Sequence, residues 1–325
     1  MSDEGMIIFS MEIDGKGSGR PLVGEEIRDC LKDDRLAWVH LDAGHEGTRE
    51  WLQANVDYLD PIILDSLLAK ETRPRSVEYD NGILLILRGV NLNENADPED
   101  MISLRMWIDP HRIITMQRRN LMAVGDIQSK LKEGKGPRGA AEFLTAVSTR
   151  LIDRMEPVIL DLNEQVDDIE EGILDEPDIQ KRTELTDLRK TAIILRRYIM
   201  PQKEVVVSLR NSDQDWLDQA SRRKFQEIQD RLVRYIEDLD LIRERSQIVK
   251  DELANMLADR LNKNMYVLSV IAAIFLPLGF LTGMFGINIG GMPGVDSPYA
   301  FVVFTGILVL IVVLQILLFK KMKWF

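Results

Sequence analysis

One short uncharged turn near the C-terminus carries the residues of this chain best suited to handle a cation. The stretch GMFGINIGGMPG (residues 283–294) is rich in glycine, and Asn288 is its only polar side chain. It lies between two long apolar runs, at residues 265–284 and 299–319. Amide and backbone carbonyl oxygens are neutral groups that can hold the water around a divalent cation without trapping the ion. The turn is therefore the first candidate site for ion chemistry.

The two apolar runs have the length and composition of membrane-spanning helices. Each contains no acidic or basic residue and reaches roughly 30 Å as a helix, which matches the hydrocarbon thickness of a bilayer. The alternative is a pair of helices buried in a soluble core. The basic tail at residues 320–325, with Lys320, Lys321 and Lys323, predicts a cytoplasmic C-terminus. Because the N-terminus lacks the pattern of a secretory signal and there are two spans, we expect both termini in the cytoplasm.

Small and polar residues recur along one side of the first span. They follow steps of three, four and seven, which places them on one stripe of a helix: Asn262, Ser269, Ala272, Gly279, Gly283 and Gly286. Such a stripe is typical either of a pore lining or of close helix packing. The second span is apolar on nearly every side and is expected to face lipid. Since two helices cannot enclose a water-filled path, transport through this chain would require an oligomer.

Acidic residues dominate the segment from 153 to 178, where Arg154 is the only base. One interpretation is a solvated helical hairpin. The other is a face that attracts cations, because a divalent ion relieves the repulsion among clustered carboxylates. The candidate metal-binding residues on this face are Asp161, Glu164, Asp167, Asp168, Glu170 and Glu171.

The elements that must position these residues fall into an α/β part and a helical part. Strand and helix patterns alternate in residues 1–139, which predicts an α/β domain, and the stretch KEGKGPRG (132–139) is the expected linker. Residues 140–264 are expected to form a helical hairpin and a long stalk helix with a heptad seam. No break separates that helix from the first span at 265–284. The remaining segments are the turn at 285–298, the second span at 299–319 and the tail.

Composition excludes several classes of function. The net charge of −12 argues against a nucleic-acid partner, and the single cysteine excludes an intramolecular disulfide. We find no phosphate-binding loop, catalytic triad or metal-ligand motif, so the chain is not expected to be an enzyme or to hold a permanent cofactor. His40, Asp42 and His45 lie close together in the sequence, and we interpret them as ordinary surface polarity.

Several segments of the sequence resemble a known family. The residues FGIN (285–288) between the two spans are similar to the Gly-Met-Asn signature of CorA-type divalent metal transporters, and the tail KKMKWF resembles the end of that family. The segment DPIILDSLLAKETRPRSVEYDNGILLIL resembles the family's Arg-Pro region. Here Ile287 replaces the methionine of the signature, and acidic residues are absent from IGGMPG. Both departures resemble the ZntB branch, which is associated with zinc uptake.

The resemblance implies a homopentameric funnel in a bacterial inner membrane. Its cytoplasmic α/β domain would be followed by a stalk helix continuous with the pore helix, and the second helices would form an outer ring. Gly286, Ile287 and Asn288 would form the outer selectivity ring. The implied pore lining is Asn262, Met265, Ser269, Ala272, Leu276, Gly279 and Gly283. The implied cargo is Zn²⁺, with cadmium, nickel and cobalt as further candidates, and both passive and proton-coupled transport stay open.

Two alternatives accompany this hypothesis. The first is a magnesium or cobalt channel of the same family. The second is a membrane-anchored coiled-coil scaffold or sensor that conducts no ion, which the heptad seam fits equally well.

Overall fold

The fold is known from a computed structural model of the 325-residue chain. It describes residues 5–33, 35–56, 58–175, 178–287, 294 and 296–322. The chain divides into two compact units, Met1–Asp251 and Glu252–Phe325. Asn288 and Lys323 lie outside the described residues.

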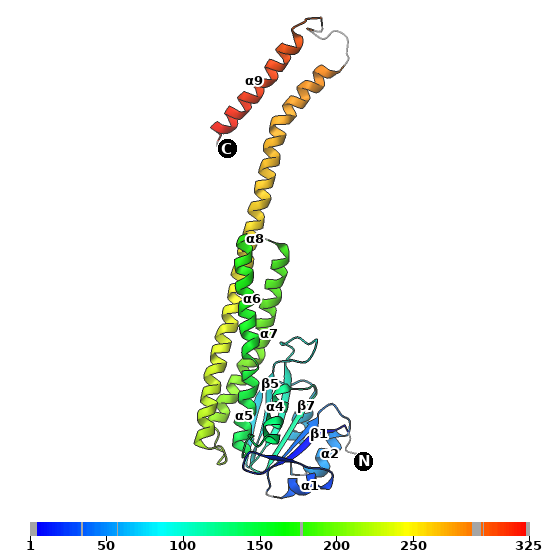
Figure 1. The fold of residues 1–325 in the computed structure, drawn as a ribbon, viewed down its shortest axis with the longest axis vertical. Helices are drawn as coiled ribbons and strands as arrows, with labels where there is room; N and C mark the ends of the chain where they lie inside the picture. Colours follow the sequence, from blue (N-terminus) through cyan, green and yellow to red (C-terminus); the bar gives the residue numbers. More distant parts are fainter. Residues whose placement is uncertain are drawn as a thin grey trace. The chain divides into compact units, whose positions relative to one another are not determined.

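A mixed β-sheet forms the centre of the first unit (Figure 1). Its strands are β1 (Ile7–Ile13), β2 (Gly19–Pro21), β3 (Ala37–Asp42), β4 (Arg75–Tyr79), β5 (Gly82–Gly89), β6 (Ile102–Ile108) and β7 (Arg112–Gln117). They run in the order β2-β1-β3-β7-β6-β5-β4. The central pair, β3 and β7, is parallel, and the other neighbours are antiparallel. The predicted α/β character of the N-terminal part is confirmed.

Helices cover the sheet and then make up the rest of the chain. They are α1 (Glu25–Lys32), α2 (Thr48–Asn55), α3 (Pro61–Leu68), α4 (Met122–Lys132), α5 (Ala140–Asp153), α6 (Glu156–Asp175), α7 (Ile179–Arg210), α8 (Gln219–Gly286) and α9 (Ala300–Lys321). The expected uninterrupted helix from stalk to first span is confirmed in α8. Its N-terminus is fixed by Asp218, whose carboxylate accepts a hydrogen bond of 2.7 Å from the Ser221 backbone N–H.

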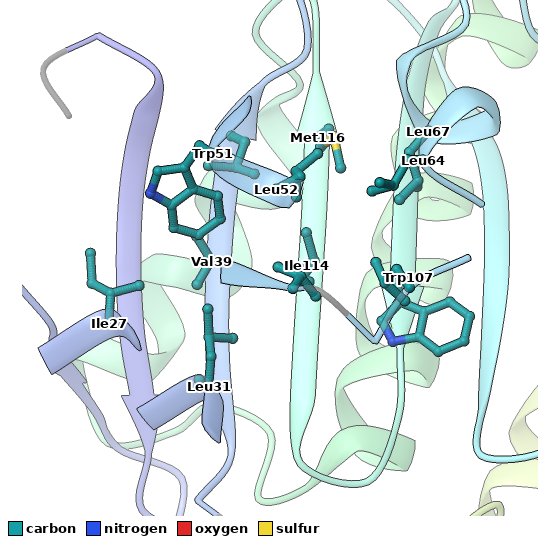
Figure 2. Packing of buried hydrophobic residues seen from close by; sticks show 14 of the residues in the cluster. Ile27, Leu31, Val39, Trp51, Leu52, Leu64, Leu67, Trp107, Ile114 and Met116 are labelled. Carbon is teal, nitrogen blue, oxygen red and sulfur yellow. The ribbon is translucent and has the colours of Figure 1, made fainter. Parts of the chain in front are cut away.

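One face of the sheet is buried under α1, α2 and α3, as Figure 2 shows. The side chains that meet there are apolar and come from helices and strands alike: Ile27, Leu31, Val39, Trp51, Leu52, Leu64, Leu67, Trp107, Ile114 and Met116. Burying each one contributes roughly 1.5–3 kcal/mol relative to leaving it in water. The alternation of apolar residues along β3 and β7 therefore determines which face these helices cover.

The opposite face of the sheet contains a buried polar group centred on Thr115. Its hydroxyl accepts a hydrogen bond of 2.8 Å from the Trp38 indole N–H, and His40 Nδ1 lies 2.8 Å from the same oxygen. The Phe143 ring of α5 packs on Trp38 at 4.7 Å between centroids. Here the interpretation of His40 as surface polarity is wrong, because the side chain is only 1% exposed. Alternate residues of β3 share one face, so His40 follows Trp38 under α5.

The start of α3 shows how a side chain positions a helix in this domain. Asp60 Oδ1 accepts a hydrogen bond of 2.7 Å from the Ile62 N–H, and Pro61 occupies the first turn. We expect Asp60→Ala to lower the free energy of unfolding by about 1 kcal/mol. Denaturant unfolding of the purified protein measures this loss. The control is Asp60→Asn, which keeps an acceptor oxygen; equal losses in both variants would contradict the cap.

Two arginines hold the other end of α3. Arg105, which is 1% exposed, donates a hydrogen bond of 2.9 Å to the Ala69 carbonyl, and Arg118 donates one of 3.0 Å to the Leu68 carbonyl. Carbonyls at a helix C-terminus carry partial negative charge, so cations stabilise them. Burial, followed by repulsion from Arg118 and Arg88, lowers the pKa of Arg105 to about 10. The guanidinium stays charged at neutral pH and binds the end of the helix.

The seam expected on the stalk part of α8 is present. Its apolar residues are buried at heptad spacing: Phe225, Ile228, Leu232, Tyr235, Leu239, Ile242, Val249 and Leu253. Met256, the last residue expected in the seam, is only half-buried. Ser246 interrupts the seam without leaving a polar group unpaired, because its hydroxyl donates a hydrogen bond of 2.7 Å to the Ile242 carbonyl.

The second unit contains the two apolar segments. The apolar window of α8 has a mean hydropathy of 2.2 and that of α9 a mean hydropathy of 3.0, and both helices are long enough to cross a membrane. Only 6% of the apolar window of α8 and 0% of that of α9 are buried within the chain. A core helix of a soluble protein would be mostly buried, so the chain has the features of a membrane protein.

Candidate functional site

The predicted pore-lining residues all lie on the apolar part of α8 and its approach. Seven positions are exposed within a single chain: Asn262, Met265, Ser269, Ala272, Leu276, Gly279 and Gly283. The covered positions of the same helix are Val270, Ala273, Ile274, Leu278 and Leu281. At 100° per residue, the two sets are centred about 150° apart around the helix axis. The stripe therefore lies nearly opposite the covered face of α8.

The covered face of α8 belongs to the side that pairs with α9. The Phe285 and Phe304 rings lie 5.0 Å apart between centroids, and Gln315 Nε2 donates a hydrogen bond of 3.3 Å to the Ala273 carbonyl. Figure 1 shows α9 running in the direction opposite to the last part of α8. Because α9 takes one side of α8, the stripe is left available to water or to another chain.

Oxygen atoms along the stripe come from one hydroxyl, one amide and the backbone. The Ser269 hydroxyl donates a hydrogen bond of 2.8 Å to the Met265 carbonyl, which leaves its lone pairs free to accept from water. Asn262 supplies an amide. Such neutral oxygens can bind the hydration shell of a cation, whereas they provide no charge to hold a bare ion.

The glycines of the stripe have no packing role inside one chain. A Cβ atom built on Gly279, Gly283 or Gly286 would meet no atom within 4 Å, apart from the local helix backbone. Packing against the rest of the same chain therefore does not explain the glycines at these positions.

The predicted selectivity ring begins where α8 ends. Gly286 is the last residue of the helix, and Ile287 follows it with 49% of its surface exposed. Asn288 lies outside the residues that the structure describes. The assignment of Gly286, Ile287 and Asn288 to an ion-selective ring stays a prediction.

The predicted acidic face lies on α6, and part of it is already neutralised. Arg245 of α8 pairs with Glu170 and, at 2.6 Å, with Asp167, and the hydrogen bonds to Glu170 and then Asp167 raise the pKa of its guanidinium. Asp161 accepts a hydrogen bond of 2.7 Å from Gln165. Glu164, Asp168 and Glu171 complete the predicted set.

Two of these acids, Asp161 and Asp168, line a hollow of about 510 Å³ on the first unit. Further carboxylates from the loop after β5 and from α7 line it as well: Asp97, Glu99, Glu184 and Asp187. Across the described part of the chain, however, no three carboxylate, histidine or cysteine groups are arranged to hold a metal ion. A regulatory cation on this face stays a prediction.

Gln315 is a residue of this site that was not predicted from the sequence. The second span was expected to be apolar on nearly every side, yet Gln315 directs its amide at the backbone of α8. The signal was present in the sequence, because Pro277 in the first span leaves one carbonyl without its donor. Matching that carbonyl to Gln315 required the two helices to be aligned in space.

Comparison of the sequence and the fold with known proteins finds similarity to metal-ion transporters. The family model of the CorA-like Mg²⁺ transporter protein matches residues 33–321. A protein named zinc transport protein ZntB from Pectobacterium atrosepticum is 35% identical over 317 residues, covering 98% of this chain and 95% of the relative.

A second relative links the sequence to a solved structure. The divalent cation transporter CmaX from Pseudomonas aeruginosa is 35% identical over 326 residues, covering 99% of this chain and 98% of that protein. A structure described as the full-length CmaX protein superposes with a TM-score of 0.86 and 34% identity, and covers 99% of both chains. Both the α/β unit and the apolar helices thus have counterparts in one solved chain.

Proposed function

This chain belongs to the CorA-like Mg²⁺ transporter family, and on that premise we propose that it carries divalent metal cations, zinc above all, across a membrane. The observation that supports transport is the stripe on α8, a row of small and polar positions on the side of the helix nearly opposite its covered face. The observation that supports zinc is the similarity over nearly the whole chain to proteins named zinc transport protein.

The path for the ion is formed by several chains. One chain offers a single striped helix, so the stripe can enclose a lumen only when copies surround an axis. We infer a homopentamer with α8 lining the lumen and α9 facing lipid, as the family resemblance implies. Asn288 and the carbonyls beside it would then form a neutral ring at the outer mouth, and Ile287 would give that ring its departure from the Gly-Met-Asn signature.

The proposed location is the bacterial inner membrane with both termini in the cytoplasm. Lys320 and Lys321 form the last turn of α9, where positive charge favours the cytoplasmic side. The acidic α/β unit, placed on the same side, would attract divalent cations to the inner mouth.

Zinc flux into liposomes tests the proposal. Purified full-length protein is expected to admit zinc to vesicles that contain a zinc-sensitive dye. Asn288→Ala removes the amide from every chain of the proposed ring, so we expect the initial rate to fall at least about tenfold, which corresponds to a barrier raised by about 1.4 kcal/mol. The control is Asn211→Ala, the same change at an exposed position after α7. An unchanged rate in Asn288→Ala would remove the turn from the mechanism.

The same vesicles separate the alternatives. Excess magnesium that abolishes zinc entry while itself being transported would favour the magnesium or cobalt channel. An imposed pH gradient that changes the zinc rate would establish proton coupling. A dimeric mass in mild detergent, with no flux of any metal, would favour the scaffold or sensor.

A further inference from the structure

Pro277 leaves an unpaired carbonyl in the middle of the pore-lining helix. In an α-helix each backbone N–H donates to the carbonyl four residues earlier, and proline has no N–H. The carbonyl that loses its donor is therefore that of Ala273. In a bilayer there is no water to replace the missing bond, and an unsatisfied backbone group costs several kcal/mol in hydrocarbon.

Gln315 of α9 supplies the missing donor. Its Nε2 lies 3.3 Å from the oxygen of Ala273, the same carbonyl that Pro277 leaves unpaired. The amide must point its nitrogen at Ala273, because the reverse orientation would bring two acceptor oxygens together. The carbonyl of this amide, Gln315 Oε1, is buried and has no partner among the described residues. Placing a half-buried amide in an apolar helix costs free energy, and its single hydrogen bond to Ala273 recovers only part of that cost. We therefore expect the bond to have a role in the protein.

We infer that Gln315 is a positioning residue that replaces the backbone hydrogen bond removed by Pro277, and so fixes the local geometry of α8 behind the pore lining. Ala273 directly follows Ala272 of the stripe, and Leu276 directly precedes Pro277. The bond therefore links α8 to α9 beside two proposed lining residues, Ala272 and Leu276, and contacts neither of them. Its effect on transport rests on the proposed function, whereas its effect on helix pairing does not.

The pairing makes a specific prediction for combined variants. Gln315→Leu leaves the Ala273 carbonyl unpaired in the wild-type helix, so we expect a melting temperature a few degrees lower in detergent. Pro277→Ala restores the backbone N–H, and in that background Gln315→Leu should be neutral or stabilising, because leucine is better suited to lipid than glutamine. The sign of the effect therefore depends on residue 277.

Transport provides the second measurement. We expect Gln315→Leu to lower the maximal zinc flux about three- to tenfold with an unchanged half-saturating zinc concentration, since the residue touches no ion. In the Pro277→Ala background the Gln315→Leu change should leave the maximal flux unaltered. Thr305→Val is the matched control, because the Thr305 hydroxyl donates to the Phe301 carbonyl of its own helix.

The two measurements separate failure of the inference from failure of the proposed function. Equal destabilisation by Gln315→Leu in both backgrounds would overturn the inference and assign Gln315 to a contact with another chain. No difference between Gln315→Leu and wild type in melting temperature would also overturn it. If the wild-type protein transports no zinc, the melting temperatures still decide whether Gln315 pairs with Ala273.

Discussion

Replacing Gly283 by leucine is expected to reduce zinc flux to the leak of protein-free liposomes. Gly283 lies on the exposed stripe of α8, nearly opposite the covered face, and a Cβ atom there would meet no atom within 4 Å in its own chain. Leucine also favours the helix over glycine by about 1 kcal/mol. The single chain therefore accommodates the change, whereas in the proposed pentamer five leucines around one axis would obstruct the lumen.

The matched control is Gly306→Leu on α9. A Cβ at Gly306 likewise meets no atom within 4 Å, and the residue belongs to the helix proposed to face lipid. Its flux should stay close to that of the wild type. Size-exclusion chromatography of all three proteins completes the experiment. An intact oligomer of Gly283→Leu with normal flux would remove the stripe from the ion path. Dissociation of that variant would show that the small residues serve close packing between chains.

The elements that could be predicted from sequence are those whose pattern is strong and local. β5 is a continuous apolar run, and its burial on both faces follows directly. The pattern of β4 does not predict a strand, because Arg75 and Glu78 give it the composition of a loop and only its edge position in the sheet makes it a strand. The pattern of α1 is weak for another reason: the helix has only 8 residues, and no side chain caps its N-terminus.

The same distinction applies to the candidate site. The stripe is a property of one helix, so its spacing was sufficient to identify Ser269 and Gly283. The bond from Gln315 to Ala273 depends on how two helices align, and no periodicity within either helix reports it. His40 was misinterpreted because its neighbours in sequence, Asp42 and His45, are more exposed, while the side that β3 presents to α5 is set by the sheet.

Acid is expected to destabilise the α/β unit through His40 between pH 6.5 and about pH 4. Burial lowers the pKa of His40 to about 4 from its ordinary value of 6.5, although hydrogen bonds with Gln117 and Thr115 and the charge of Asp42 oppose the shift. Above pH 6.5 the imidazole is neutral in both the folded and the unfolded chain, so it has no effect on stability. As the pH falls from 6.5 towards 4, only the unfolded chain gains the proton, and the folded state loses stability.

The expected loss is about 2–3 kcal/mol between pH 7 and pH 4.5. Thermal unfolding of the full-length protein in detergent, followed across this range, measures it as a falling melting temperature. His40→Gln keeps a polar group near Thr115 but cannot take up a proton, so most of the fall between pH 6.5 and 4.5 should vanish. The Arg119 hydrogen bond lowers the pKa of Asp100 below its ordinary value of 3.8. Carboxylates of this kind lose their contribution to stability only at more acidic pH. A fall of equal size in His40→Gln would therefore show that another group takes up the proton in this range.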